Sequence, residues 1–291
     1  MFRSYFNFMT RTGKMLPFLK ETALYRKMVP HYARLRTLYE HRGHTPVDDA
    51  IAFYTKNAVR VNAVANMLAD ERSRKEYLGI IKFRQSHQKK DFPLCDGKLP
   101  EYFIEEVTFG KDEVFLDCGA YIGDTLDVFV KRCPNYANIV AFEPDKKNFA
   151  LLTQKYGNNP KITLMDIGVY DADGESSFAE RGLKSNSAIT DKTSENTACI
   201  SIKAIDNLNL KNVSFVKMDI EGAELPALKG AKKTIARDKP KLAICIYHSD
   251  EDMLSIAEYI HALVPEYKLY VRHHRLYPMC GETVLYAVMP Y

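Results

Sequence analysis

The stretch "VFLDCGAYIGDT", residues 114–125, joins a hydrophobic run to a turn that contains two glycines. The run predicts a buried strand that ends at Asp117, and Gly119 lets the backbone turn tightly beside a ligand. Gly123 lies near the start of the next predicted helix. The pattern D-x-G-x-x-x-G lacks the middle glycine of the dinucleotide fingerprint. It indicates a cofactor-binding turn or, alternatively, a turn whose glycines only relieve crowding.

Short apolar runs alternate with helical patterns from this stretch to the end of the chain. Such alternation predicts right-handed crossovers and a parallel sheet covered on both faces. Only a few residues join the last two runs, so we expect them to form an antiparallel hairpin at one sheet edge. The expected strands are "EVFLDCG", "NIVAFEP", "KITLMDIGVY", "SFVKMDIEG", "KLAICIYH", "YKLYVRHH" and "ETVLYAV".

The first 90 residues lack strand alternation and predict helices. Asp70 has the side chain and position of an N-cap for a helix over "ERSRKEYLGIIKFR". The following segment, "QSHQKKDFPLCDGKLPEYF", carries two prolines and is typical of a linker. We therefore expect an N-terminal helical region at residues 1–97 and a separate α/β domain at residues 98–291.

The composition, 46% hydrophobic and 27% charged residues, is that of a soluble globular protein. No apolar run approaches the roughly 20 residues that span a bilayer, and the first residues lack a signal-peptide core, so we predict a cytoplasmic protein. Residues 1–100 carry 19 Lys/Arg against 9 Asp/Glu, and residues 101–291 carry 22 against 28. The basic part predicts a solvated helix face or, alternatively, a contact with nucleic acid, anionic lipid or a phosphorylated substrate.

A second acidic residue narrows the choice of cofactor. Glu143 ends the predicted strand in "NIVAFEPD", 26 positions after Asp117. A carboxylate at that place accepts hydrogen bonds from a ribose diol. It also repels a pyrophosphate but attracts the cationic, phosphate-free S-adenosylmethionine (SAM). The residues thus favour SAM over NAD.

Four stretches together resemble the FkbM family of SAM-dependent methyltransferases. They are "VFLDCGAYIGDT", "IVAFEPDKKNFALL", "FVKMDIEGAELPALKGA" and the closing "AICIYHSDEDMLSIAEYI…YKLYVRHH…ETVLYAV". The resemblance covers roughly residues 100–291, and K-x-D-x-E-G-x-E at residues 217–224 is its most specific part. It implies a Rossmann-like, seven-stranded class I methyltransferase fold and methyl transfer, usually to a hydroxyl of a sugar or natural product.

The resemblance also implies which residues bind SAM. Asp166, which closes the third strand, is expected beside the adenine amino group, and Asp124 either contacts the cofactor or caps the helix that follows the turn. The predicted cofactor-binding residues are Asp117, Gly119, Tyr121, Gly123, Asp124, Glu143, Asp166 and Asp219.

The predicted catalytic residues are Asp219, Glu221 and His248. Methyl transfer is an in-line displacement, so alignment does most of the work and a base removes the proton of the hydroxyl. His248, at the end of the fifth strand, is the predicted base; the alternative is a helix cap. Asp219 and Glu221 alternatively suit Mg²⁺, but the sequence offers no obvious third ligand. We therefore predict no metal.

Four further residues are predicted to bind the acceptor. Ser185 and Asn186 lie in a polar loop after the third core strand, and the ends of that loop, "ESSFAE" and "ACISIKAI", suit short strands. Arg272 and His273 end a strand and suit an acceptor carboxylate or phosphate. A solvated loop and an ordinary edge-strand charge are the alternatives.

We expect a SAM-dependent O-methyltransferase that acts on a sugar, glycan or other small metabolite. The alternatives are a nucleic-acid-modifying or nucleic-acid-binding protein and a catalytically silent SAM-binding module. The first lacks the N-P-P-Y signature, and the acidic residues at the strand ends argue against the second. We expect no nucleic-acid partner; a peripheral membrane contact through "MFRSYFNFMTRTGK" is an alternative to helix packing.

Overall fold

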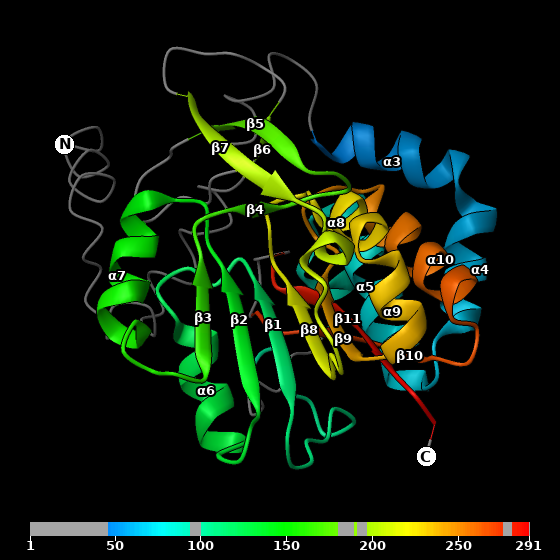
Figure 1. Cartoon of the computed structure of the whole chain (residues 1–291). Coiled ribbons are helices and arrows are strands. Elements are labelled where there is room, and N and C mark those ends of the chain that lie inside the picture. Colours follow the sequence, from blue (N-terminus) through cyan, green and yellow to red (C-terminus); the bar gives the residue numbers. More distant parts are fainter. Residues whose placement is uncertain (1–45, 94–99, 180–188, 191–196, 276–280, 291) are drawn as a thin grey trace, which may run out of the picture.

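The computed structural model describes residues 46–93, 100–179, 189–190, 197–275 and 281–290. Its main element is a seven-stranded sheet with the strand order β10-β11-β9-β8-β1-β2-β3 (Figure 1). The strands are β1 (Val114–Cys118), β2 (Asn138–Phe142), β3 (Ile162–Met165), β8 (Phe215–Met218), β9 (Lys241–Cys245), β10 (Lys268–His273) and β11 (Thr283–Val288).

Parallel pairing joins β3, β2, β1, β8 and β9, whereas β11 runs antiparallel to both β9 and β10. The connection between β10 and β11 is too short for a crossover helix, so the two strands form a hairpin. The predicted mostly parallel sheet with a C-terminal antiparallel hairpin is confirmed.

Helices cover both faces of this sheet because successive strand residues point to opposite sides. Phe115 packs in a cluster with α6 (Asp124–Arg132) and α7 (Lys146–Tyr156). Its neighbour Leu116 belongs to the other cluster. That second cluster includes residues of α8 (Glu224–Gly230), α9 (Lys232–Asp238) and α10 (Asp252–Leu263). Both faces are therefore buried, as the continuous apolar strands predict.

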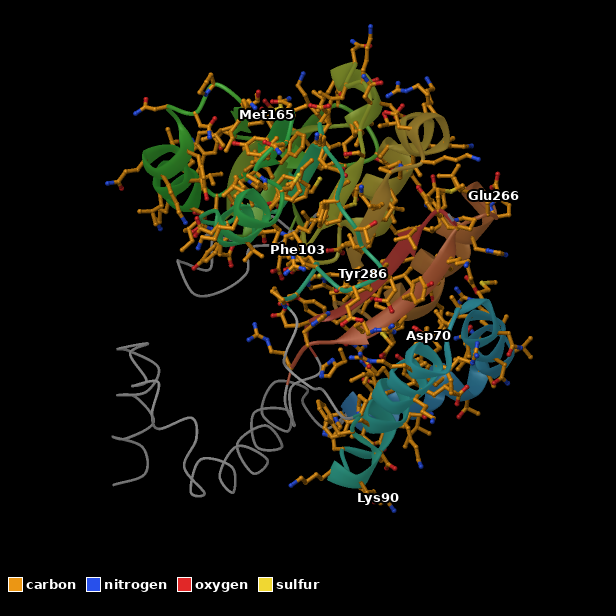
Figure 2. All side chains as sticks on the ribbon, turned by 90° about the horizontal axis from the view of Figure 1, so that it is seen from below. Asp70, Lys90, Phe103, Met165, Glu266 and Tyr286 are labelled. Atoms are coloured by element: carbon orange, nitrogen blue, oxygen red, sulfur yellow. The ribbon has the colours of Figure 1, made fainter. Side chains whose placement is uncertain are left out.

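The N-terminal helices pack against the β10 side of the sheet (Figure 2). They are α3 (Pro46–Lys56), α4 (Ala58–Met67) and α5 (Glu71–Ser86), followed by the short 3₁₀ helix η2 (Lys89–Asp91). Asp70 caps α5 as predicted, since its Oδ1 accepts the Ser73 N–H at 2.6 Å. Leu68 forms a β-bridge with Leu269. The helical region thus shares one hydrophobic core with the sheet.

A small second sheet is inserted between β3 and β8. Its order is β4-β7-β5-β6, with β4 (Gly168–Val169), β5 (Gly174–Ala179), β6 (Ile189–Thr190) and β7 (Thr197–Lys203), and the 3₁₀ helix η3 (Ile205–Leu208) follows it. The strands expected in "ESSFAE" and "ACISIKAI" correspond to β5 and β7. Ser185 and Asn186 lie outside the described residues.

Within the described ranges, every helix is too short or too polar to cross a membrane. The cytoplasmic location stays a prediction.

Candidate active site

A cavity of about 310 Å³ lies at the carboxyl ends of β1, β2 and β8. Parallel sheets hold ligands at this edge, because the loops that follow the strands meet there. Glu143, Asp219 and Glu221 all line this cavity. The cavity therefore brings together acidic residues that the sequence placed at separate strand ends.

Two backbone N–H groups hold Glu143 at the end of β2. Tyr121 N–H donates to Oε2 at 2.7 Å, and Asp145 N–H donates to Oε1 at 2.9 Å. Burial raises the pKa of the Glu143 carboxyl to about 7, while these N–H groups act in the opposite direction. The two backbone bonds thus fix the orientation of the carboxyl group at the cavity wall.

A glycine is required at position 119, because the backbone of Asp219 passes close to it. Its φ is +81°, and a Cβ at this position would lie 2.0 Å from the backbone oxygen of Asp219. Gly123 also has a positive φ of +83°, but a Cβ there would meet the Tyr156 ring at 2.7 Å. Gly119 lines the cavity, whereas Gly123 lies outside the lining and allows α6 to pack against α7. The structure thus gives Gly123 a packing role, and its contact with the cofactor stays a prediction.

Asp117 also lies outside the cavity lining. Its side chain is fully buried, and its Oδ1 lies 3.2 Å from the Lys217 ammonium group. Burial raises the pKa of Asp117 to about 6, against the opposing effect of Lys217. Lys217, not Asp117, lines the cavity, and its Nζ donates to the Gly119 carbonyl at 2.6 Å. Asp117 is therefore linked to the turn at Gly119 through Lys217, and its contact with the cofactor stays a prediction.

The remaining predicted cofactor residues lie at or near the cavity. Tyr121 and Asp124 line it. Asp124 is also the first residue of α6 and accepts the Thr125 N–H at 3.0 Å, so it also satisfies a backbone N–H in the first turn of the helix. Asp166 is exposed and lies outside the lining, although the next residues, 167–169, belong to it. Its adenine contact stays a prediction.

Two tyrosine hydroxyls fix Asp219, which directly follows β8. Tyr102 donates to Oδ2 at 3.0 Å and Tyr247 donates to Oδ1 at 3.1 Å. Glu221 lines the same part of the cavity with a backbone φ of +62°. Burial raises the pKa of Glu221 to about 7, and nearby His248 opposes this.

His248 lies three residues beyond the end of β9, not at its end as predicted, and outside the cavity lining. Its Nε2 is 3.5 Å from Asp219 Oδ1 and 3.6 Å from Glu221 Oε2. Its Nδ1 is 3.2 Å from Glu224 Oε1. Burial lowers the pKa of the imidazole, but the three carboxylates outweigh burial and raise it to about 9. The interpretation of His248 as a helix cap is wrong, because Ser249 Oγ accepts the N–H of Asp252 at the start of α10.

Arg272 and His273 do not reach the cavity. The Arg272 guanidinium is buried and bonds to Asp70 at 2.8 Å and to Ser73 at 2.6 Å, on and beside α5. His273 is also buried and pairs with Thr283 at 2.9 Å. Both residues join the N-terminal helices to the sheet edge, so their assignment to acceptor binding is corrected.

Several cavity residues escaped the sequence prediction. They are Glu101, Tyr102, Thr125, Asn148, Lys217, Tyr247, Arg275 and Glu282. Tyr102 comes from the segment predicted to be a linker, and Tyr247 stands next to the predicted His248. Burial and the Glu282 carboxylate raise the pKa of Glu101 to about 9.

Four of the nine non-glycine residues with a positive φ in the described part of the chain line this cavity. Tyr102, Tyr121, Glu221 and Glu282 line it and have φ values of +69°, +50°, +62° and +59°. Non-glycine residues in the left-handed region cost about 1–3 kcal/mol each and cluster at functional sites. This pattern gives a structural signal that no sequence motif carried.

The strand order and the position of the cavity define a class I methyltransferase. The family model of the methyltransferase FkbM domain matches residues 117–270, more than half of the chain. The chain therefore belongs to the FkbM methyltransferase family, as the sequence resemblance predicted.

Two relatives illustrate the match. The crystal structure of methyltransferase FkbM from Methylobacillus flagellatus KT is 27% identical with a TM-score of 0.68, and the match covers 81% of this chain and 60% of that one. Hexuronic acid methyltransferase AglP from Haloferax volcanii is 27% identical over 124 residues, 41% of this chain and 50% of the relative. The chain thus spans about half the length of this curated relative.

Proposed function

We propose that the protein is a SAM-dependent O-methyltransferase whose acceptor is a hydroxyl of a sugar or glycan. The observation that carries the proposal is that Glu143 and Asp219, from the ends of β2 and β8, line one cavity. A ribose-binding carboxylate and a second carboxylate beside the reacting centre are what a nucleoside cofactor with a cationic sulfonium requires. SAM supplies an electrophilic methyl group at this place.

The chain's own residues would hold the cofactor at the β2 end of the cavity. Each oxygen of Glu143 accepts one backbone N–H and has a second lone pair that would accept from the ribose diol. Gly119 lets the turn approach the end of β8 without a side chain between them. Asp219, held by two tyrosines, would face the positive sulfonium.

The acceptor would enter beside Glu221, Tyr247, Arg275 and Glu282. Hydroxyl, carboxylate and guanidinium groups together suit a ligand with several hydroxyls. Glu221 is the proposed proton acceptor in place of His248, since Glu221 lines the cavity and His248 does not. As the acceptor oxygen bonds to the methyl carbon, the carbon–sulfur bond breaks and the hydroxyl proton passes to Glu221.

The relative from Haloferax volcanii supports a sugar acceptor, because it is a hexuronic acid methyltransferase. The cavity also fits a small polar ligand better than a nucleic acid. Acidic residues outnumber basic ones among the lining residues that the structure describes, and they would repel a phosphate backbone. We propose a small-molecule or glycan partner on this basis.

Two experiments test the proposal. Calorimetry with SAM and with NAD should detect binding of SAM alone, weakened by Glu143→Ala. Mass spectrometry of cellular glycan and lipid fractions, with and without the protein, should then reveal one component that differs by one methyl group. Binding of NAD in preference to SAM would refute the cofactor assignment, and a methylated nucleic acid would refute the acceptor class.

A further inference from the structure

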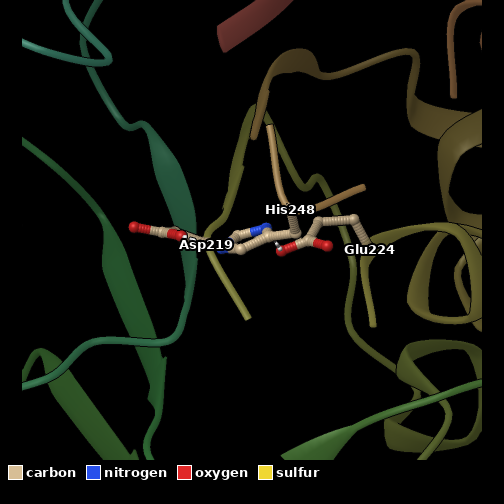
Figure 3. A group of neighbouring side chains, drawn as sticks. All are labelled: Asp219, Glu224 and His248. Atoms are coloured by element: carbon tan, nitrogen blue, oxygen red, sulfur yellow. Dashed lines mark ion pairs between the residues drawn. The ribbon is translucent and has the colours of Figure 1, made fainter. Parts of the chain in front are cut away.

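Three carboxylates surround the imidazole of His248, and two of them, Asp219 and Glu221, line the cavity. Figure 3 shows His248 between Asp219 and Glu224, which lie on opposite sides of its ring. Nε2 lies 3.5 Å from Asp219 Oδ1, and Nδ1 lies 3.2 Å from Glu224 Oε1. Glu221 Oε2 lies 3.6 Å from the same Nε2. One imidazole thus faces three acidic groups.

The polar atoms of this cluster lie at ion-pair distances but lack aligned hydrogen bonds. Among the described residues, neither ring nitrogen of His248 has an aligned hydrogen-bond partner, although its side chain is only 10% exposed. Glu224 is 0% exposed, and its Oε2 likewise finds no partner there. An unsatisfied buried polar atom typically costs about 1–3 kcal/mol, and more when charged. The arrangement therefore points to a ligand that these atoms share.

Other groups already orient the carboxylates. The Ile220 N–H donates to Glu224 Oε1 at 2.7 Å, which leaves Oε2 free. The Tyr247 and Tyr102 hydroxyls hold the two oxygens of Asp219. Hydrogen bonds of this kind to ligating carboxylates are typical of metal sites, where they set the ligand direction.

We infer that Asp219, Glu224 and His248 bind a divalent cation of the Mg²⁺ or Mn²⁺ type. Their ligand atoms all lie within 4.8 Å of one another. Ligands on opposite sides of an ion with bonds of about 2.1 Å are about 4.2 Å apart, so the widest separation must close by at most about 0.6 Å. The imidazole must also rotate, because one ring nitrogen has to face both carboxylates. Two carboxylates and one imidazole, from which the bound ion would displace the proton, form a hard, anionic donor set that suits these ions.

This cation would act in the proposed methyl transfer, and its role rests on that function. Asp219 belongs to the cavity wall, so an ion bound to it would be open to the cavity on one side. The acceptor hydroxyl oxygen would take an open coordination position, which lowers the pKa of that hydroxyl. The proton would still pass to Glu221, the oxygen–methyl bond would form and the carbon–sulfur bond would break.

Manganese binding to the full-length chain tests the inference without any acceptor. The protein is first freed of metal with EDTA, and Mn²⁺ is titrated by electron paramagnetic resonance. We expect one Mn²⁺ per chain with a Kd below about 1 mM, competition by Mg²⁺, and a histidine ¹⁴N coupling in the pulsed spectrum. His248→Gln should abolish the coupling, and His248→Gln and Glu224→Gln should each weaken binding at least about tenfold.

A matched control is Glu266→Gln, which removes one carboxylate from an exposed ion pair with Lys239. It should leave the Mn²⁺ affinity within about twofold of the parent. If a cluster variant does not fold, the spectrum of the parent protein tests the proposed site. Absence of ¹⁴N coupling or of Mn²⁺ binding in the parent would refute the site. Equal Mn²⁺ binding by folded His248→Gln also overturns it.

The failure of this inference and that of the proposed function are distinguishable. SAM binding by calorimetry in EDTA tests the cofactor site alone. Intact SAM binding and methyl transfer in EDTA would refute the cation and leave the methyltransferase in place. Loss of SAM binding in Glu143→Ala with unchanged Mn²⁺ affinity is the expected separation of the two sites.

Discussion

The ammonium group of Lys217 lies 3.2 Å from the Asp117 carboxylate and donates to the Gly119 carbonyl at 2.6 Å. Asp117 and Lys217 are register partners on the parallel strands β1 and β8, so their side chains leave the sheet on the same face. The pair joins the first motif of the chain to the K-x-D-x-E-G-x-E element. It fixes the turn on which the cofactor is proposed to rest.

Replacing Lys217 with methionine should lower the free energy of unfolding. The change keeps the length of the side chain but leaves the Asp117 carboxylate buried without its counter-ion, which typically costs about 3–5 kcal/mol. The double variant Lys217→Met/Asp117→Asn should recover part of the loss. Urea denaturation measures both, and equal stability of parent and Lys217→Met would show that the pair contributes nothing.

Gly119→Ala should destabilise the protein by about 2–4 kcal/mol and weaken SAM binding, because a Cβ would lie 2.0 Å from the Asp219 backbone oxygen. Gly174→Ala is the matched control, since a Cβ there has no heavy atom within 4 Å. Its stability should stay within about 0.5 kcal/mol of the parent. Similar losses in both variants would mean that close packing at residue 119 is not the cause.

SAM affinity should increase as the pH rises from 6 to 8. Burial raises the pKa of Glu143 to about 7, so the carboxylate that accepts from the ribose is largely protonated at pH 6 and ionised at pH 8. We expect a change of up to about tenfold from this single group. Calorimetry across this pH range measures the SAM affinity. The variant Glu143→Gln shows the pH dependence that comes from all other titrating groups. A parent profile parallel to that of Glu143→Gln would exclude Glu143 as the source.

Arg272→Met and Arg275→Met should separate the structural role from the acceptor role. The Arg272 side chain is 4% exposed and pairs with Asp70 and Glu106, so its loss should cost about 2–4 kcal/mol without a change in SAM affinity. The Arg275 side chain is 51% exposed beside Glu282, so its loss should cost at most about 1 kcal/mol but raise KM for the acceptor. A reversed result would restore Arg272 to the acceptor site.

Glu221→Gln should lower the rate of methyl transfer by about 10²- to 10⁴-fold, because the amide cannot take the hydroxyl proton. SAM affinity should stay within about twofold, since Glu143 and the turn at Gly119 hold the cofactor. Single-turnover measurement at saturating SAM, with the acceptor found by mass spectrometry, gives the rate. A rate within about threefold of the parent would assign the proton to another group.

Local patterns in the sequence were enough to predict the sheet and part of the site. Apolar runs separated by helical periods predicted the parallel strands, and Asp70 was recognisable as a cap because its bond to Ser73 spans only three residues. Glu143 and Asp219 were found because the carboxyl ends of parallel strands share one edge of the sheet. Such features depend on neighbours in the chain or on rules common to all sheets of this type.

The tertiary structure alone decided which of these side chains meet. Arg272 turns away from the cavity because α5, about 200 residues earlier in the chain, covers its strand and offers Asp70. Tyr102 reaches Asp219 from a segment that resembles a linker. His248 lies between Asp219 and Glu224 because β8 and β9 are neighbours and their loops converge. The sequence thus determined the strands and the sheet edge where the cofactor is proposed to bind. Strand register, the face of each side chain and long-range packing arose only when the chain folded, because they depend on contacts between residues far apart in sequence.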